Sequence, residues 1–427
     1  MRPAHILFSC LAGALLLGSG CTEDFGPEPP GNNSPGVNND PVQIVPADGS
    51  SEIYIGTNYT FKNDPNAPVD YVVSGMIVIL DSITTIEPGT VIHFANPDCG
   101  IRTAYTGALY AAGTAEAPIL LRGVDDYRGS WRGIFFGTER YENVLKYCTI
   151  RNAGGKKDVN LNEAAAVAIN SDDEANKLKM LHIENCTIEN NNGFGFYCGS
   201  LNAKINGFLG NTLGGNTLSS VGLPFKYAHV LDISNNFQPV ENPNQYAWIY
   251  FYNDGFNQNL DLESPLTLKN LGIPYRFNGS EGITIIGSGL TIEPGVSVEF
   301  GINGGFLVKD NGFLQAEGTA AQPIVFKGIN GNPGSWTGIS FQNDQTSNIL
   351  RYCHVIGGGN KKAPWCDGQA NITLGDWFGG NGRATIENCH IASSGAYGIA
   401  KKAGSSLSQN GNTFTLNVSQ PDIYNYQ

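Results

Sequence analysis

The chain has 427 residues, of which 55 are glycine, 41% are hydrophobic and only 15% are charged. This composition is typical of many tight turns around a dry core, and it argues against an intrinsically disordered chain. The formal charge of −13, without any cluster of lysine and arginine, argues against a nucleic-acid partner, because nucleic-acid binding depends on neutralising phosphates.

Residues 1–20 have the features of an export signal. A short basic start with Arg2 and His5 is followed by an apolar run, and small residues precede Cys21. The apolar run is too short to span a membrane. Small residues directly before a cysteine resemble the bacterial lipobox, in which the cysteine becomes the lipidated N-terminus of the mature protein. The sequence therefore predicts a lipoprotein signal peptide with lipidation at Cys21, and the alternative is an ordinary cleaved signal.

Residues 21–42 are rich in proline, glycine and asparagine and contain little that a core could bury. Such a segment is typical of a flexible spacer. We therefore expect an exported protein that its lipid holds on the bacterial outer membrane or cell surface, with the membrane as one partner and the folded body beyond the spacer.

Two copies of one block make up the rest of the chain, residues 43–225 and residues 226–427, each about 200 residues long. The first copy contains Thr85-Ile-Glu-Pro-Gly89, Gly129-Ser-Trp-Arg-Gly-Ile134, Leu145-Lys-Tyr-Cys-Thr-Ile150 and Ile183-Glu-Asn-Cys-Thr-Ile188. The second contains Leu290-Thr-Ile-Glu-Pro-Gly295, Gly334-Ser-Trp-Thr-Gly-Ile339, Leu350-Arg-Tyr-Cys-His-Val355 and Ile386-Glu-Asn-Cys-His-Ile391. Strands of four to six residues with alternating apolar character lie between these turns. Because the motifs recur in one order, we predict one continuous solenoid and not a sandwich or barrel.

Most of the matched residues are expected to be structural. Proline and glycine in the Glu-Pro-Gly motif supply the φ values that a turn needs. The two tryptophans are expected to pack in the core, although sugar stacking is the alternative. The matched cysteines follow an aromatic residue or asparagine inside an apolar alternation, which favours buried thiols over disulfides. The residues with an expected structural role are Glu87, Pro88, Gly89, Trp131, Cys148, Cys186, Glu293, Pro294, Gly295, Trp336, Cys353 and Cys389.

Taken together, these motifs resemble the repeat of pectin-lyase-like right-handed parallel β-helix proteins, and in particular the bacterial surface lipoproteins built from that repeat. The resemblance covers about residues 43–427. It implies an all-β fold, a single-stranded parallel solenoid that is right-handed. At about 20–25 residues per coil, we expect roughly 15 coils stacked ~4.8 Å apart. The same fold serves lyases, glycosidases and adhesins, so it does not determine activity.

Insertions at matched places in the two copies are the candidate ligand sites. Each begins with a Lys-Lys pair, and we expect both to project from the same side of the rod, where lysine, aspartate and tryptophan would form a groove for a glycan. Ordinary solvated loops are the alternative. The candidate glycan-binding residues are Lys156, Lys157, Asp172, Asp173, Lys361, Lys362, Trp365, Asp367 and Trp377.

The sequence contains no recognisable catalytic set or metal motif. Asp172-Asp173 faintly resembles the aspartate pair of polygalacturonases, but the other motifs of that family are missing. There is no Cys-x-x-Cys or Cys/His zinc spacing. Ca²⁺ would be expected only if the protein were a lyase of this fold. We therefore assign no catalytic residue, metal ligand or cofactor.

Three functions agree with this pattern. The preferred hypothesis is a lipid-anchored envelope β-helix that acts without catalysis in adhesion or glycan binding. The second is a polysaccharide lyase or glycoside hydrolase that uses the loops. The third is a structural spacer in an envelope assembly, with another envelope protein as partner.

Overall fold

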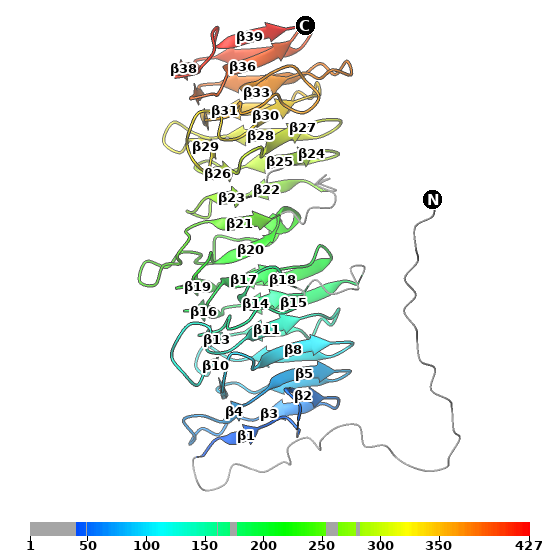
Figure 1. Cartoon of the computed structure of the whole chain (residues 1–427), viewed down its shortest axis with the longest axis vertical. Helices are drawn as coiled ribbons and strands as arrows, with labels where there is room; N and C mark the ends of the chain where they lie inside the picture. Colours follow the sequence, from blue (N-terminus) through cyan, green and yellow to red (C-terminus); the bar gives the residue numbers. More distant parts are fainter. Residues whose placement is uncertain (1–39, 48, 160, 171–176, 253–263, 279–281) are drawn as a thin grey trace, which may run out of the picture.

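The computed structural model describes residues 40–47, 49–159, 161–170, 177–252, 264–278 and 282–427. It confirms the predicted all-β class: parallel strands stack into a solenoid of about 13 turns, and 2% of the chain is helical. Figure 1 shows the turns rising in chain order from one end of the molecule to the other. Within these ranges, no helix has the length and apolar character that crossing a membrane requires.

Two sheets are confined to the first half of the solenoid. The 7-stranded sheet is ordered β1 (Val42–Ile44), β4 (Tyr71–Val73), β7 (Val91–Phe94), β10 (Ile119–Gly123), β13 (Cys148–Arg151), β16 (Thr187–Glu189) and β19 (Thr212–Gly214). A 6-stranded sheet contains β3 (Tyr59–Phe61), β6 (Ile83–Ile86), β9 (Ala108–Ala112), β12 (Val144–Lys146), β15 (Lys179–Glu184) and β18 (Ala203–Leu209).

One 14-stranded sheet runs through both halves. In the first half it contains β2 (Glu52–Ile55), β5 (Met76–Leu80), β8 (Gly100–Ala104), β11 (Gly133–Phe136), β14 (Ala165–Ile169), β17 (Phe194–Cys198) and β20 (Val221–Pro224). It continues through β21 (Ile249–Tyr252), β23 (Tyr275–Phe277), β26 (Ser297–Phe300), β29 (Ile324–Gly328), β32 (Cys353–Ile356), β35 (His390–Ala392) and β38 (Thr413–Thr415).

Two further 6-stranded sheets complete the second half. One contains β22 (Leu266–Leu268), β25 (Gly289–Ile292), β28 (Phe313–Glu317), β31 (Ile349–Arg351), β34 (Arg383–Glu387) and β37 (Ser406–Asn410). The other contains β24 (Ile283–Ile285), β27 (Gly305–Val308), β30 (Gly338–Phe341), β33 (Ala370–Leu374), β36 (Tyr397–Lys402) and β39 (Ile423–Tyr426). The turns are fewer than the roughly 15 expected because loops such as 152–164 lengthen individual coils.

Side chains that alternate between the two faces of each strand determine which residues form the core. In β10, Ile119 and Leu121 are fully buried while Leu120 and Arg122 are partly exposed, as a period of two requires of a strand with one face on the core. Residues at the same place in successive coils stack, so one apolar core extends along the whole solenoid from Ile44 to Ile399. Each strand therefore buries its inward face against the coils before and after it.

Buried asparagine side chains form hydrogen-bonded ladders from one coil to the next. The Asn191 side chain donates to that of Asn216 at 2.9 Å, and Asn216 donates to Asn244 in the next coil at 2.7 Å. Buried polar groups need such partners, because water cannot reach them. These ladders hold successive turns in register.

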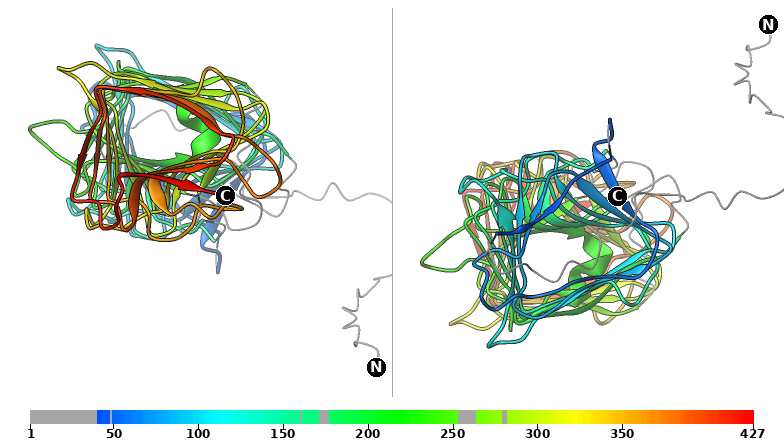
Figure 2. Two further views of the ribbon diagram at one scale, coloured as in Figure 1. Left: turned by 90° about the horizontal axis from the view of Figure 1, so that it is seen from above. Right: turned by 90° about the horizontal axis from the view of Figure 1, so that it is seen from below.

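The two halves meet at a short 3₁₀ helix, η1 (Phe225–Val230), which lies within the outline of the turns in Figure 2. Its Phe225 ring contacts the rings of Phe251 and Phe277, both with centroids 5.2 Å away. Before η1, the second strand of each turn belongs to the 14-stranded sheet. After η1, the first strand of each turn belongs to that sheet. Cys148 and its sequence counterpart Cys353 therefore lie in different sheets.

Candidate functional site

The first candidate loop follows β13 and is tied to its own part of the solenoid. Lys156 Nζ lies 2.5 Å from Asp98 Oδ1, and the backbone oxygen of Lys157 accepts a hydrogen bond from Arg132 Nη2 at 3.1 Å. Asp172 and Asp173 lie outside the described residues. The structure therefore gives this loop an ion pair, and the arrangement of its lysines with Asp172 and Asp173 stays a prediction.

The second candidate loop follows β32, and it brings four of its five candidate residues together. Lys362 Nζ lies 2.6 Å from Asp367 Oδ1, and Trp377 Nε1 donates to Asp367 Oδ2 at 3.0 Å. The backbone nitrogen of Trp377 donates to the backbone oxygen of Trp365 at 2.7 Å. The loop before β33 and the loop after it thus meet at Asp367. The fifth residue, Lys361, lines a small pocket of about 180 Å³ over β27 and β30.

Three aromatic side chains stand exposed where these loops meet. Trp365 is 43% exposed, Trp377 is 57% exposed and Phe378 is 81% exposed. We call these three residues the aromatic platform. Soluble proteins rarely leave several large aromatic side chains together in water unless a ligand or partner covers them. The platform, which includes the predicted residues Trp365 and Trp377, is therefore the strongest candidate interaction surface around the predicted loops.

The backbone beneath the platform is fixed before any ligand arrives. Asp376 Oδ1 accepts hydrogen bonds from the backbone nitrogens of Phe378 at 2.9 Å and Gly380 at 2.7 Å. Lys402 Nζ donates to the backbone oxygen of Asp376 at 2.6 Å. These bonds hold the loop in one conformation, which lowers the entropy that binding has to overcome.

Trp365 itself occupies an uncommon conformation. Its φ is +52°, in the left-handed region that side chains other than those of glycine, asparagine and aspartate rarely adopt. Lys309 Nζ lies 5.3 Å from the centre of its ring, close enough for a cation–π contact. Strained residues cluster at binding sites, where surrounding contacts compensate for the strain.

Asp367 is placed as a hydrogen-bond acceptor. Hydrogen bonds from the Lys362 ammonium and then from the Trp377 indole lower the pKa of its carboxyl. The carboxylate therefore stays ionised at neutral pH, where it accepts hydrogen bonds. This arrangement positions Trp377 and offers an acceptor beside the platform.

The described parts of the two candidate loops lie far apart along the axis of the solenoid. Seven steps of the 14-stranded sheet separate β14, which follows the first loop, from β32, which precedes the second. At ~4.8 Å per step this is about 34 Å along the axis. The loops also leave different sheets, because the first connects the 7-stranded to the 14-stranded sheet and the second leaves the 14-stranded sheet.

The matched tryptophans of the repeats are core residues. Trp131 and Trp336 have no exposed surface, and each Nε1 donates to a backbone oxygen at 2.7 Å, that of Arg151 and that of Ile356 respectively. They stack on Phe94 and Phe300 with centroids 4.2 and 4.8 Å away. Neither ring is available to a sugar.

The matched glutamates connect coils. Glu87 Oε2 accepts a hydrogen bond from the backbone nitrogen of Asn63 at 3.2 Å, and Glu293 Oε2 accepts one from that of Asn270 at 2.8 Å. Gly89 has a φ of +84° and Gly295 a φ of +82°, as the turn requires. These residues hold turns together and are not placed as a catalytic pair.

The cysteines of the folded body are free thiols, and all seven are buried. Burial raises the pKa of Cys148, and it raises the pKa of Cys198 to about 12. A thiol whose pKa is raised in this way, as in Cys148 and Cys198, is not a nucleophile at neutral pH. Within the described ranges, no group of three or more histidine, cysteine, aspartate or glutamate side chains could hold a metal ion.

Sequence reasoning missed two parts of this site. Phe378 directly follows Trp377 in the run Asp376-Trp-Phe-Gly-Gly380, and an apolar dipeptide among turn residues was the available signal. Lys309 lies far away in sequence and reaches Trp365 only through the stacking of coils. No family model, no curated protein and no solved structure matches the chain.

Proposed function

We propose that this protein is a lipid-anchored, exported β-helix of the bacterial envelope, akin to pectin-lyase-like repeat proteins, that binds glycans at the aromatic platform without cleaving them. The observation that carries the proposal is the exposure of Trp365, Trp377 and Phe378 on loops that Asp367 and Asp376 hold together. A role in adhesion follows from a binding loop on a long scaffold that a lipid attaches to the cell.

A glycan is the ligand whose chemistry agrees best with this surface. The C–H faces of a pyranose are apolar and pack on aromatic rings, while its hydroxyls need hydrogen-bond partners. The platform supplies the rings, and Asp367 and Lys362 supply an acceptor and a donor at its edge. Aromatic side chains also lose little conformational entropy on binding, which makes them efficient contacts.

The platform favours binding over hydrolysis. A glycosidase needs one carboxylic acid whose pKa is raised, so that it is protonated when it meets the leaving group. At Asp367 the shift has the opposite direction, because Lys362 and Trp377 donate to it. An acid held in this way contributes hydrogen bonds and charge instead of a proton.

The experiment is a glycan array probed with the full chain and with the variants Trp365→Ala and Trp377→Ala. We expect a defined set of glycans to be bound by the wild type and to lose at least about tenfold in affinity in each variant, because a stacked ring is removed. Tyr127→Ala, which removes an exposed aromatic residue far along the chain, is the matched control and should bind as the wild type does. Equal binding by all four proteins would contradict the proposal.

A further inference from the structure

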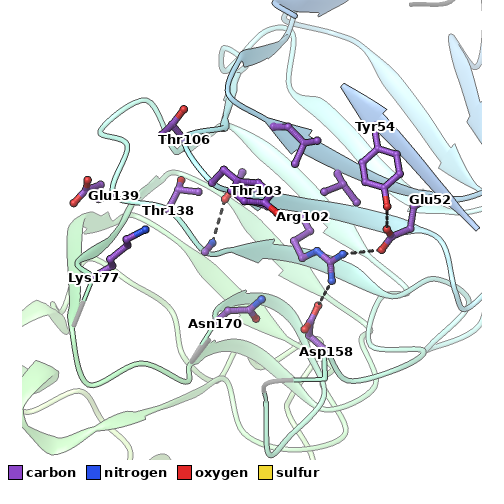
Figure 3. A pocket seen from close by; sticks show the side chains of 15 residues that line it. Glu52, Tyr54, Arg102, Thr103, Thr106, Thr138, Glu139, Asp158, Asn170 and Lys177 are labelled. Atoms are coloured by element: carbon purple, nitrogen blue, oxygen red, sulfur yellow. Dashed lines mark hydrogen bonds and ion pairs between the residues drawn. The ribbon is translucent and has the colours of Figure 1, made fainter. Parts of the chain in front are cut away.

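A second hollow lies in the first half of the solenoid, on the outer face of β2, β5 and β8. It has a volume of about 530 Å³, which is within the range of small-molecule sites. Figure 3 shows it with Tyr54 and Glu52 at one end and Lys177 and Glu139 at the other. We call it the outer cleft. None of its lining residues belongs to the aromatic platform.

The floor of the outer cleft is apolar and its edge is aromatic. Val78, Leu80 and Ala104 line the floor, because every second side chain of β5 and β8 points away from the core. Tyr54 and Tyr105 are exposed at the edge. An apolar floor beside exposed phenol rings suits a ligand with a flat apolar face.

The charges of the cleft are largely balanced within it. Arg102 Nη2 lies 2.7 Å from Glu52 Oε1, and Arg102 Nη1 lies 3.7 Å from the buried Asp158 Oδ2. Tyr54 also donates to Glu52, at 2.5 Å. Because two carboxylates already share the guanidinium, Arg102 is not left to bind the carboxylate of a ligand. Glu139 adds another acceptor to the lining.

One buried polar atom in the lining lacks a partner. Asn170 is only 4% exposed, and its side-chain oxygen accepts no hydrogen bond from the part of the chain that the structure describes. In Figure 3 it lies between Asp158 and Lys177, across the cleft from Thr103. Buried polar groups in folded proteins nearly always have a partner, so an orphaned acceptor in a cleft points to a ligand that donates a hydrogen bond.

We infer that the outer cleft binds an uncharged, hydroxyl-rich sugar unit, separately from the aromatic platform. The sugar packs its apolar face on the floor and on Tyr105, and one hydroxyl donates to Asn170. Acidic sugars are disfavoured, because the three carboxylates of the lining outnumber its two cations, Arg102 and Lys177, and Arg102 is already shared. A site that hydrogen-bonds a hydroxyl discriminates strongly against a ligand that lacks it.

Saturation-transfer NMR with free sugars tests this inference on the full chain in detergent. The probes are glucose, galactose, mannose and N-acetylglucosamine, with galacturonate as the charged comparison. We expect at least one neutral sugar to bind and galacturonate to bind more weakly. Asn170→Ala and Tyr105→Ala should each weaken binding of that sugar by about tenfold or more. Tyr141→Ala, an exposed residue outside the lining, is the matched control.

Thermal unfolding of the same variants separates a ligand contact from a structural role. Asn170→Ala removes an acceptor without a partner, so it should leave the unfolding midpoint unchanged or slightly raised. If that variant does not fold, Tyr105→Ala decides the question. Absence of neutral-sugar binding, or equal binding by wild type and both cleft variants, overturns the inference. Loss of sugar binding only in Trp377→Ala would also overturn it and would assign the sugar to the platform.

Discussion

Tryptophan has two different roles in this chain, and the burial of the side chain distinguishes them. Trp336 is fully buried, stacks on Phe300 and has its indole nitrogen satisfied by a backbone oxygen. Trp365 is partly exposed, adopts a left-handed φ and lies beside Lys309. The first contributes to stability, whereas the second is held at some cost in conformational energy.

Substitution of the two tryptophans should therefore separate stability from binding. Trp336→Ala should lower the free energy of unfolding by about 3–5 kcal/mol, as expected for a large buried aromatic side chain. Trp365→Asn should change it by no more than about 1 kcal/mol, because asparagine tolerates a positive φ and the ring is partly exposed. Urea unfolding followed by circular dichroism measures both. A larger loss for Trp365→Asn than for Trp336→Ala would show that the platform is a structural element.

At the scale of residues, the sequence predicts the roles that repeat and misses those that depend on contacts across coils. The matched turns and alternating strands specify which side chains face the core, because a period of two leaves no other arrangement for short stacked strands. Asn170 and Lys309 carry no local signal. Their surroundings come from segments many residues away, which only the stacking of turns brings near.

At the scale of elements, the junction between the halves is where the regular pattern changes. Helix η1 replaces the third strand of its turn. After it, a different strand of each turn belongs to the 14-stranded sheet. Matched strands such as β13 and β32 therefore belong to different sheets. The expectation that the matched loops lie on one side of the rod stays a prediction.

An ion pair joins two segments that follow this junction and gives this part of the solenoid a pH dependence. Asp232 Oδ2 lies 2.6 Å from Lys269 Nζ, and hydrogen bonds from Lys269 and then from Ser234 lower the pKa of Asp232 to about 2. An unperturbed aspartate titrates near ~3.9. Because the folded-state pKa is the lower one, this contribution to stability is complete above about pH 4 and is lost as the pH falls through about 2.

Thermal unfolding of the wild type and Lys269→Met between pH 5 and pH 2 tests this account. The variant should unfold at a lower temperature at pH 5, and the difference between the two proteins should shrink as the pH falls towards 2. The difference should be small, because both side chains are partly exposed. A difference that stays constant or grows on acidification would show that Asp232 is not stabilised by Lys269.

At the scale of the whole molecule, the proposal places a long rod on a lipid anchor. The anchor rests on Cys21 and on the apolar run before it, and both lie outside the described residues. Cys21→Ser should move the protein from the membrane fraction to the soluble exported fraction, because a serine cannot receive the lipid. Cell fractionation with an immunoblot measures this, and Cys99→Ser, at a buried body cysteine, is the control. Unchanged membrane association of Cys21→Ser would contradict the anchor.

In this solenoid, the residues that stabilise the fold are distinct from those that form the proposed binding surfaces. Its stability comes from one core repeated along the axis, so loops between strands are free to vary without unfolding their neighbours. The aromatic platform and the outer cleft are both built on the outer side of that core, in different halves. Repeated turns reveal the scaffold in the sequence, while each proposed binding surface occurs once and leaves no repeat to detect.

The most direct test of the central claim follows one glycan selected by the array through binding and product analysis. The full chain is titrated with that glycan, and the mixture is then analysed by chromatography and mass spectrometry beside a Trp377→Ala sample. The proposal predicts saturable binding by the wild type, a loss of about tenfold or more in the variant, and a glycan of unchanged mass. New reducing ends or unsaturated fragments in the wild-type sample alone would identify an enzyme and contradict the claim that the platform binds without cleaving.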